Sequence, residues 1–362
     1  MSRGASCIYC GDMDMDKRKN CGARRNTMRA LMTAASVALL AACGPAPSPA
    51  DKTSTSAPPA APTTIVVFAS PNTDSTPLWG AVAQGYYTAA GLDVQLKVFP
   101  SGTTALQSFR SGQGDISMSG ELPSVNYWGS VDEDYRVITP MTRHTEGYVA
   151  ETLASVKTPK DLIGKTIATR IGSSGSWFVA EFLKKNNIAP DQVKLINLDT
   201  NQMPIALDKG DIAGFFVWQP FGFQAAKLSG DKVHQLTTAA GYMRGYTVLG
   251  ARPAWLEKNR DAAIRFVAAT QKGATWAKAN PGELATYLEK NYGTDPQQTI
   301  DVMKYIDLTM AFDPQFYEDF ASVSAYAKEA GSVKQTMDWS KYLWTDGLQA
   351  LGAGRVTTPP RP

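Results

Sequence analysis

The chain has 362 residues, and its 36 Lys and Arg against 33 Asp and Glu give a formal net charge of +3. Removing residues 1–42 takes away seven of the basic and three of the acidic residues and leaves a net charge near −1, so the basic excess does not indicate a nucleic-acid-binding surface. Residues 43–362 hold one of the four cysteines, which excludes an internal disulfide, and Cys7, Cys10 and Cys21 lack a fourth ligand at zinc-site spacing.

Residues 1–42 are predicted to be a secretory signal peptide. Arg24, Arg25 and Arg29 lead into the 13 mostly apolar residues 30–42, and small alanines close the run. A run of this length is too short to cross a bilayer, which takes about 20 apolar residues. The pattern therefore favours a cleaved signal over a membrane-spanning helix.

Cys43 follows Leu-Ala-Ala directly, and this order resembles the signal of bacterial lipoproteins. The resemblance implies that the signal is removed and that Cys43 becomes a lipid-carrying N-terminus. The alternative is an ordinary cleaved signal that happens to contain a cysteine.

Residues 1–27 are interpreted as the product of a mis-assigned start codon, with translation beginning at Met15 or Met28.

Residues 43–63 are predicted to form a flexible tether. Residues 44–64 hold six of the 22 prolines, set among Ala, Ser and Thr with almost no large apolar side chains. Such a segment cannot bury enough apolar surface to offset the entropy lost on ordering. The predicted location is therefore the periplasm or cell envelope, with the protein anchored to a membrane through lipid on Cys43.

From residue 64 on, short β-rich runs alternate with helical stretches, which favours mainly parallel sheets with right-handed crossovers. The helix predicted over 77–91 has Thr76 as a candidate N-cap, Pro77 at its first position and Gly91 at its end. The first series as a whole predicts strands at 65–70, 92–100, 115–120 and 135–141, and helices at 77–91, 101–112 and 122–129.

A second α/β series follows the first. It predicts strands at 165–170, 193–199, 213–218 and 247–251, and helices at 175–187, from Gln202, near 220–229, and throughout the part after Arg260, including 297–310 and 315–330. Two such units, with chain crossings near 143–155 and 238–250, predict two lobes joined by two hinge segments. The predicted boundaries are 64–148 for the first part of lobe 1, 149–240 for lobe 2, 241–352 for the return to lobe 1 and the C-terminal helices, and 353–362 for a flexible tail.

Seven short motifs occur along this part of the chain. They are Gly-Leu-Asp-Val within 86–94, Ser-Gly at 101–102, Gly-x-Gly-Asp-Ile at 112–116, Asp-Leu-x-Gly-Lys-x-Ile-Ala at 161–168, Gly-Ser-Ser at 172–174, Lys-Gly-Asp-Ile at 209–212 and Trp-x-Pro at 218–220. In this order and spacing, over roughly residues 64–280, the chain resembles the nitrate/taurine/aliphatic-sulfonate substrate-binding proteins of ABC importers. The resemblance implies a type II periplasmic-binding fold, α/β in class, with two lobes that close on a small ligand by hinge motion and permease subunits as partners.

The candidate ligand site lies beyond the carboxyl ends of the strands, where helix N-termini offer unpaired N–H groups and partial positive charge. The run at 171–177 is the densest such junction, because its glycines let the backbone approach a ligand and its serines offer hydroxyl donors, although serine is also a common helix N-cap. The predicted ligand-binding residues are Thr73, Ser75, Ser101, Thr103, Thr104, Glu121, Gly172, Ser173, Ser174, Trp177, Asn201 and Trp218.

Three of these residues have two interpretations each. Trp177 and Trp218 form either an aromatic wall of the cleft or part of the core. Glu121 lowers the affinity for an anion unless a cation or a donor faces it. Either it points away and bonds to the backbone, or the ligand carries an amine or N–H group.

The predicted function is an extracytoplasmic solute-binding lipoprotein that captures a small anionic or sulfonate-like ligand by lobe closure and delivers it to an ABC importer. The alternative is a protein that binds a thiamine-pyrimidine precursor or another small heterocycle, because binding proteins for such ligands resemble this sequence at the level of the fold. An enzyme is not expected, because the sequence has no Gly-x-Ser-x-Gly elbow and His144 and His234 stand in no recognisable catalytic constellation. No catalytic residue, metal site, cofactor or nucleic-acid partner is predicted.

Overall fold

The computed structural model describes residues 61–131, 134–335 and 337–359. The predicted signal peptide, Cys43 and the tether up to residue 60 lie outside the described residues, and so do residues 360–362 of the predicted tail.

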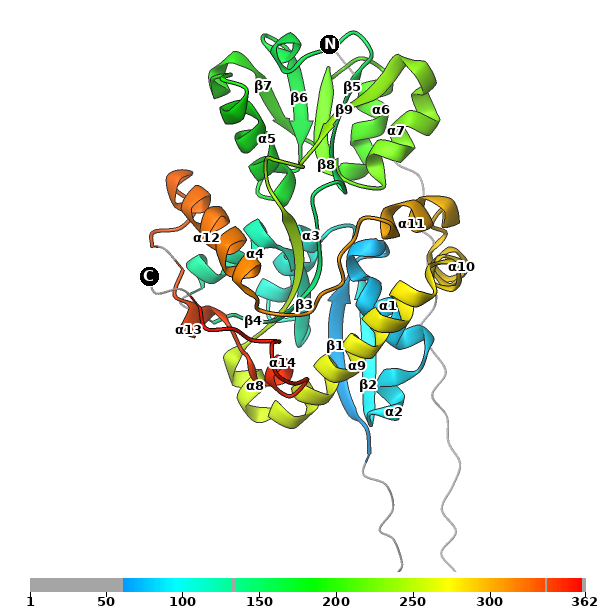
Figure 1. Ribbon diagram of the computed structural model, residues 1–362, viewed down its shortest axis with the longest axis vertical. Coiled ribbons are helices and arrows are strands. Elements are labelled where there is room, and N and C mark those ends of the chain that lie inside the picture. The colour runs from blue at the N-terminus through cyan, green and yellow to red at the C-terminus, as the bar shows by residue number, and fades with distance from the viewer. Residues whose placement is uncertain (1–60, 132–133, 336, 360–362) are drawn as a thin grey trace, which may run out of the picture. The chain divides into compact units, whose positions relative to one another are not determined.

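The first lobe is built on a five-stranded sheet with the strand order β2-β1-β3-β10-β4 (Figure 1). β1 pairs in parallel with β2 and β3, whereas β10 pairs antiparallel with β3 and β4. Four strands therefore run in one direction and β10 runs against them. The strands are β1 (Thr63–Ala69), β2 (Leu92–Val98), β3 (Ile116–Gly120), β4 (Arg136–His144) and β10 (Gly245–Ala251).

The second lobe repeats this arrangement with the strand order β7-β6-β8-β5-β9. β6 pairs in parallel with β7 and β8, and β5 pairs antiparallel with β8 and β9, so β5 alone runs against the other four strands of its sheet. The strands are β5 (Tyr148–Leu153), β6 (Thr166–Thr169), β7 (Lys194–Asn197), β8 (Gly214–Trp218) and β9 (Val233–Thr238).

The chain crosses between the two sheets twice, after His144 at the end of β4 and after Thr238 at the end of β9. The strands that follow these crossings, β5 and β10, are the reversed strands of their sheets. This is expected, because a chain that arrives from the other lobe enters a sheet at the end where the remaining four strands finish. The carboxyl ends of eight strands therefore face the crossings, and the predicted mainly parallel α/β fold is confirmed.

Helices flank both sheets, and those that follow the second crossing pack on the first lobe, with α9 against α1 and α12 against α4 (Figure 1). A Cβ on Gly80 of α1 would lie 2.3 Å from the carbonyl oxygen of Gly273 in α9, so this helix crossing requires glycine. The helices are α1 (Thr76–Ala83), α2 (Tyr86–Ala89), α3 (Gly102–Arg110), α4 (Glu121–Ser130), α5 (Ser174–Lys185), α6 (Met203–Asp208), α7 (Phe221–Ser229), α8 (Pro253–Lys258), α9 (Arg260–Ala279), α10 (Pro281–Tyr292), α11 (Pro296–Met303), α12 (Pro314–Glu329), α13 (Trp339–Tyr342) and α14 (Asp346–Gln349).

Two predicted helices differ from the structure. The helix predicted over 77–91 is divided into α1 and α2, because Gly85 adopts the left-handed backbone conformation (φ 65°). The helix predicted near 297–310 ends with α11 at Met303. Beyond it the backbone is extended, because Asp307 forms an isolated antiparallel β-bridge with Arg143 of β4.

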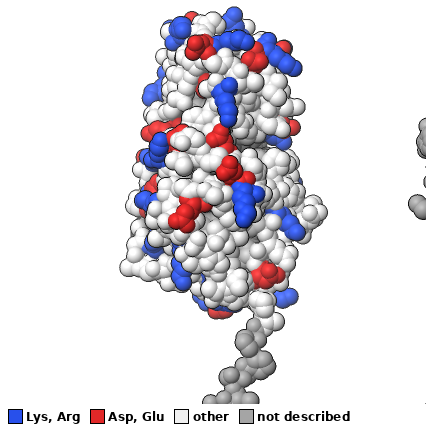
Figure 2. Space-filling model, turned by 90° about the vertical axis from the view of Figure 1, so that its right-hand side faces the viewer, with Lys and Arg blue, Asp and Glu red and all other residues white. Residues whose placement is uncertain are grey.

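The surface carries both signs of charge, and Figure 2 shows acidic and basic side chains interspersed over one face. Within residues 61–131, 134–335 and 337–359, no helix is both long and apolar enough to cross a bilayer. The same residues contain no cluster of three or more His, Cys, Asp or Glu placed to hold a metal ion.

Candidate functional site

The loops that follow the strands of both lobes meet around a cavity of about 30 Å³. This volume is room for about two water molecules, since one needs roughly 10–15 Å³ on this measure. We call it the central cavity. Its lining residues are Asp74, Gly102, Thr103, Met118, Gly120, Pro123, Tyr148, Ser173, Ser174, Trp218 and Thr247.

The helices α3 of the first lobe and α5 of the second begin at the central cavity, and each is capped by a serine. The Oγ of Ser101 accepts a hydrogen bond from the backbone N–H of Thr104 at 3.3 Å. The Oγ of Ser173 accepts one from the N–H of Gly175 at 3.2 Å and donates to the carbonyl of Arg170 at 2.6 Å. A cap satisfies one of the four N–H groups that a helix start leaves without an intrahelical partner. Residues at both helix starts, Gly102 and Thr103 in α3 and Ser174 in α5, line this cavity.

The two lobes come into direct contact at Ser174. A Cβ on Gly120 of the first lobe would lie 2.6 Å from the Oγ of Ser174 in the second, so Gly120 leaves room for this hydroxyl. Gly102 is similarly constrained, because its Cβ would lie 2.9 Å from the Cα of Ser119. These small residues let the starts of three helices, α3, α4 and α5, approach one another.

Glu121, the first residue of α4, is 1% exposed and lies directly after Gly120. Its Oε2 accepts a hydrogen bond from the backbone N–H of Tyr246 at 2.9 Å. Burial raises the pKa of the Glu121 carboxyl to about 7, although the bond from Tyr246 and the nearby Ser174 hydroxyl act to lower it. The other oxygen, Oε1, is buried, and the Ser174 hydroxyl is the side-chain group that acts on this carboxyl from the other lobe.

Asp74 and Tyr148 complete the polar wall on this side. The ring of Tyr148 stacks on His144 with the ring centroids 5.0 Å apart, and the Nε2 of His144 lies 3.6 Å from the Oδ1 of Asp74. Burial raises the pKa of the Tyr148 hydroxyl well above its ordinary value, and the charges of Glu121 and Asp74 add to that shift. The described residues that line the central cavity include no Lys or Arg. Its side chains are thus acidic or neutral.

The structure brings Thr103, Ser173, Ser174 and Trp218 together at the central cavity, with Glu121 adjacent through Gly120. Trp218 stands edge-on to Tyr148, with the ring centroids 6.4 Å apart. Both rings line the central cavity, and Trp218 is also buried against the core.

The remaining predicted site residues lie elsewhere. Ser75 is fully buried, and its hydroxyl accepts from the N–H of Ser70 at 3.0 Å. Trp177 is buried, and its Nε1 donates to Glu181 within α5 at 3.3 Å, while Asn201 is exposed. The hydroxyl of Thr104 lies 2.7 Å from that of Ser101, so it belongs to the cap of α3.

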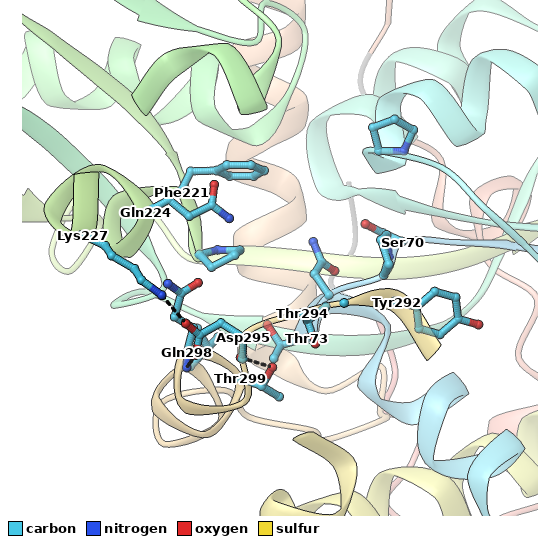
Figure 3. Close-up of a pocket in the computed structure, with 16 residues that line it drawn as sticks. Ser70, Thr73, Phe221, Gln224, Lys227, Tyr292, Thr294, Asp295, Gln298 and Thr299 are labelled. Atoms are coloured by element: carbon cyan, nitrogen blue, oxygen red, sulfur yellow. Dashed lines mark hydrogen bonds and ion pairs between the residues drawn. The ribbon is translucent and has the colours of Figure 1, made fainter. Parts of the chain in front are cut away.

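Two larger cavities lie near the central one. One, of about 400 Å³, has Thr73 from the first lobe and Phe221 from the second among its lining residues (Figure 3). There Lys227 of α7 forms an ion pair with Asp295 at 3.1 Å, drawn as a dashed line in Figure 3. The other, of about 310 Å³, shares Thr103 with the central cavity and is also lined by Gly172.

Asp74, Tyr148 and Thr247 were not predicted from the sequence. Asp74 lies between Thr73 and Ser75, two predicted ligand-binding residues, and its acidic side chain was the available signal. Tyr148 and Thr247 belong to β5 and β10, the strands that follow the two crossings. No local motif marks them, because they reach the cavity only through the pairing of these reversed strands.

Comparison with families of known proteins gives one match. Residues 72–284, more than half of the chain, match the family described as NMT1/THI5 like.

Two curated proteins are similar in sequence. The chain is 31% identical over 143 residues to the taurine-binding periplasmic protein of Escherichia coli (strain K12). The aligned segment is 38% of this chain and 44% of that protein. It is 21% identical over 235 residues to a protein of Bacillus subtilis (strain 168) named for binding aliphatic sulfonates. The aligned segment is 63% of this chain and 70% of that protein. The chain thus spans less than half the length of the taurine-binding relative.

Solved structures share the fold at low sequence identity. The periplasmic aliphatic sulphonate binding protein of Escherichia coli has a TM-score of 0.68 at 16% identity, covering 78% of this chain and 92% of that chain. The periplasmic nitrate-binding protein of Synechocystis PCC 6803 has a TM-score of 0.69 at 16% identity, covering 82% and 92%. A desulfurization enzyme has a TM-score of 0.62 at 14% identity, covering 80% and 98%. Binding proteins and an enzyme therefore share this fold.

Proposed function

Because the chain belongs to the NMT1/THI5-like family, we propose that it is an extracytoplasmic solute-binding protein of an ABC importer. It captures a small ligand between its two lobes and delivers it to the permease subunits. Its relatives named for binding taurine and aliphatic sulfonates support this class of function. The observation that carries the proposal is that both lobes contribute helix starts and hydroxyls to one cavity, to which the second lobe adds the rings of Tyr148 and Trp218.

Ligand capture requires the lobes to move. A cavity of about 30 Å³ is too small for a ligand of more than a few non-hydrogen atoms, so such a ligand enters when the lobes are farther apart. The segments 145–147 and 239–244, which connect the two sheets, are where we place the hinge. Ligand binding then closes the lobes because only the closed form offers the donors of α3 and α5 to one ligand.

We place the oxyanion head of the ligand at the starts of α3 and α5. Backbone N–H groups and the hydroxyls of Thr103 and Ser174 are neutral donors, and the helix dipoles add partial positive charge. A sulfonate-like head suits such a site without any Lys or Arg. A small heterocycle is the second candidate, favoured by the rings of Tyr148 and Trp218 on the same cavity.

We further propose that the mature protein is held in the cell envelope by lipid on Cys43. Cys43 lies outside the described residues, and the support for the anchor is the sequence order Leu-Ala-Ala-Cys before a proline-rich segment. The periplasmic location of the taurine-binding relative agrees with export.

A thermal-shift panel tests the binding function. It spans alkanesulfonates, taurine, nitrate, aromatic sulfonates and pyrimidines, each at millimolar concentration. A ligand at 100 times its Kd stabilises the folded state by about 2.7 kcal/mol, which gives a clear rise in melting temperature. Failure of every panel member to raise the melting temperature contradicts the proposal.

A further inference from the structure

The inference starts from the charge of Asp74 at the proposed oxyanion site. This carboxylate lines the central cavity, and the lining residues that the structure describes include no Lys or Arg. An anionic head at the starts of α3 and α5 would therefore meet a like charge, which lowers affinity unless a cation lies close to the carboxylate. The group that the structure places against Asp74 is an imidazole, which is a cation only when it is protonated.

That imidazole belongs to His144, the last residue of β4. It is 6% exposed, and its Nε2 lies 3.6 Å from the Oδ1 of Asp74. The other ring nitrogen, Nδ1, is buried and has no hydrogen-bond partner among the described residues. With its hydrogen on Nε2, facing Asp74, the neutral ring can take up a second proton at Nδ1.

His144 also lies where the two lobes join. The crossing at 145–147 follows it directly, and a Cβ on Gly147 would collide with its Nδ1, so the crossing packs tightly on the ring. The ring stacks on that of Tyr148, the first residue of β5, with 22° between the two planes. The imidazole therefore lies between a carboxylate of the first lobe and an aromatic ring of the second.

We propose that His144 is a positioning residue whose protonation prepares the central cavity for an oxyanion. A proton on the ring gives Asp74 a cationic partner and offsets the charge of the carboxylate, whereas the neutral ring leaves that charge facing the ligand. Anion affinity therefore rises as pH falls through the range in which histidine gains its proton, and anion binding in turn promotes proton uptake. This rests on the proposed function and adds a proton dependence to its oxyanion site.

The groups around the ring are compatible with this role. A hydrogen bond from Thr145 lowers the pKa of Glu146, and the charge of His144 acts in the same direction. Burial raises the pKa of Tyr148 well above its ordinary value, so its hydroxyl stays neutral throughout. Arg143, the preceding residue in β4, pairs instead with Asp307 and Asp313, at 2.6 and 2.7 Å.

Glu121 is a second source of pH dependence. Burial raises the pKa of its carboxyl to about 7, and its protonation would also favour an anion. The test must therefore separate the proton of His144 from that of Glu121.

Titration calorimetry with ethanesulfonate and nitrate at pH 5.5 and pH 8 tests the inference. We expect each anion to bind the wild-type protein at least about fivefold more tightly at pH 5.5. Glu121→Gln should keep this preference, and the addition of His144→Gln to that variant should remove it. In the same background, the binding heat should depend on the ionisation enthalpy of the buffer only where His144 is present, because only then is a proton taken up.

Two further variants keep the test decisive. His234→Gln is the matched control, because His234 is the other of the two histidines, its Nε2 lies 2.7 Å from the carbonyl oxygen of Val156, and it does not line the central cavity. It should leave the pH dependence intact. Asp74→Asn should raise anion affinity at pH 8 to about its value at pH 5.5, since no carboxylate remains to be offset, and it serves where His144→Gln does not fold.

The outcomes separate this inference from the proposed function. Equal wild-type affinity at the two pH values overturns the role of His144 and leaves a binding function standing. So does a preference for pH 5.5 that is lost in Glu121→Gln alone, or one that survives both His144→Gln and Asp74→Asn. If neither anion binds at either pH, the coupling is likewise overturned, and the thermal-shift panel then decides the binding function itself.

Discussion

Replacement of Ser174 by alanine should weaken ligand binding with little change in stability, whereas Ser173→Ala should do the reverse. The two serines are neighbours on the central cavity, but their hydroxyls have different partners. That of Ser173 is occupied as the N-cap of α5, with bonds to the N–H of Gly175 and the carbonyl of Arg170. That of Ser174 lies against Gly120 of the other lobe, at the central cavity where we place the oxyanion head of the ligand.

The magnitudes follow from these contacts. Loss of a neutral hydrogen bond to the ligand costs about 0.5–1.5 kcal/mol, so Ser174→Ala should lower affinity roughly threefold to tenfold. Loss of an N-cap serine costs about 0.5–2 kcal/mol of stability. At about 2–4 °C per kcal/mol for a domain of this size, Ser173→Ala should lower the melting temperature by several degrees.

The assay combines titration calorimetry with melting curves on three variants. Ser176→Ala is the matched control in the same loop, because its Oγ accepts from Gly172 at 3.1 Å and donates to Ser173 at 2.7 Å without lining the central cavity. It should behave like a cap variant. Unchanged affinity in both Ser173→Ala and Ser174→Ala refutes the oxyanion site at the start of α5.

Three more predictions concern pH, anchoring and closure. Burial raises the pKa of Glu121 and Glu151 from 4.5 to about 7, so their contribution to stability is fully present below pH 4.5 and is lost as pH rises through 7. Urea unfolding at pH 5 and 8 should show a loss of up to about 3 kcal/mol per group, which the Glu→Gln variants lack. Cys43→Ala should move the protein from the membrane to the soluble fraction, and unchanged membrane association contradicts the lipid anchor. Small-angle scattering should show a smaller radius of gyration on adding a confirmed ligand, whereas identical curves argue against hinge motion about 145–147 and 239–244.

The fold was largely predictable because its signals are local and ordered. The strand-helix alternation and the seven motifs led to the two-lobed α/β fold and to the family, both of which are confirmed. The pattern over 77–91 does not predict the break between α1 and α2, because Gly85 adopts a left-handed backbone conformation that glycine reaches without strain and that the apolar pattern does not mark. The sequence pattern does not predict β5 or β9. β5 falls within the predicted crossing at 143–155, and β9 is a half-exposed edge strand that lacks a continuous apolar run.

The candidate site was predictable only in part. The serine-rich run before α5 is a contiguous signal, and the structure places Ser173 and Ser174 on the central cavity. Trp177 and Trp218 had equal weight in the sequence, yet Trp177 lies one helical turn into α5 and is buried within the second lobe. Tyr148 reaches the cavity through strand pairing over long range, which the sequence does not encode locally.

The positions of α3 and α5 give a physical reason for closure to depend on the ligand. The two helices belong to different lobes, and residues at both helix starts line the central cavity. A ligand shifts an equilibrium only by its different affinity for the two forms. An oxyanion that contacts both helix starts gains the second contact only when the lobes are together, so its binding should drive closure. A ligand that contacts one lobe alone should bind the open and closed forms equally and leave the radius of gyration unchanged.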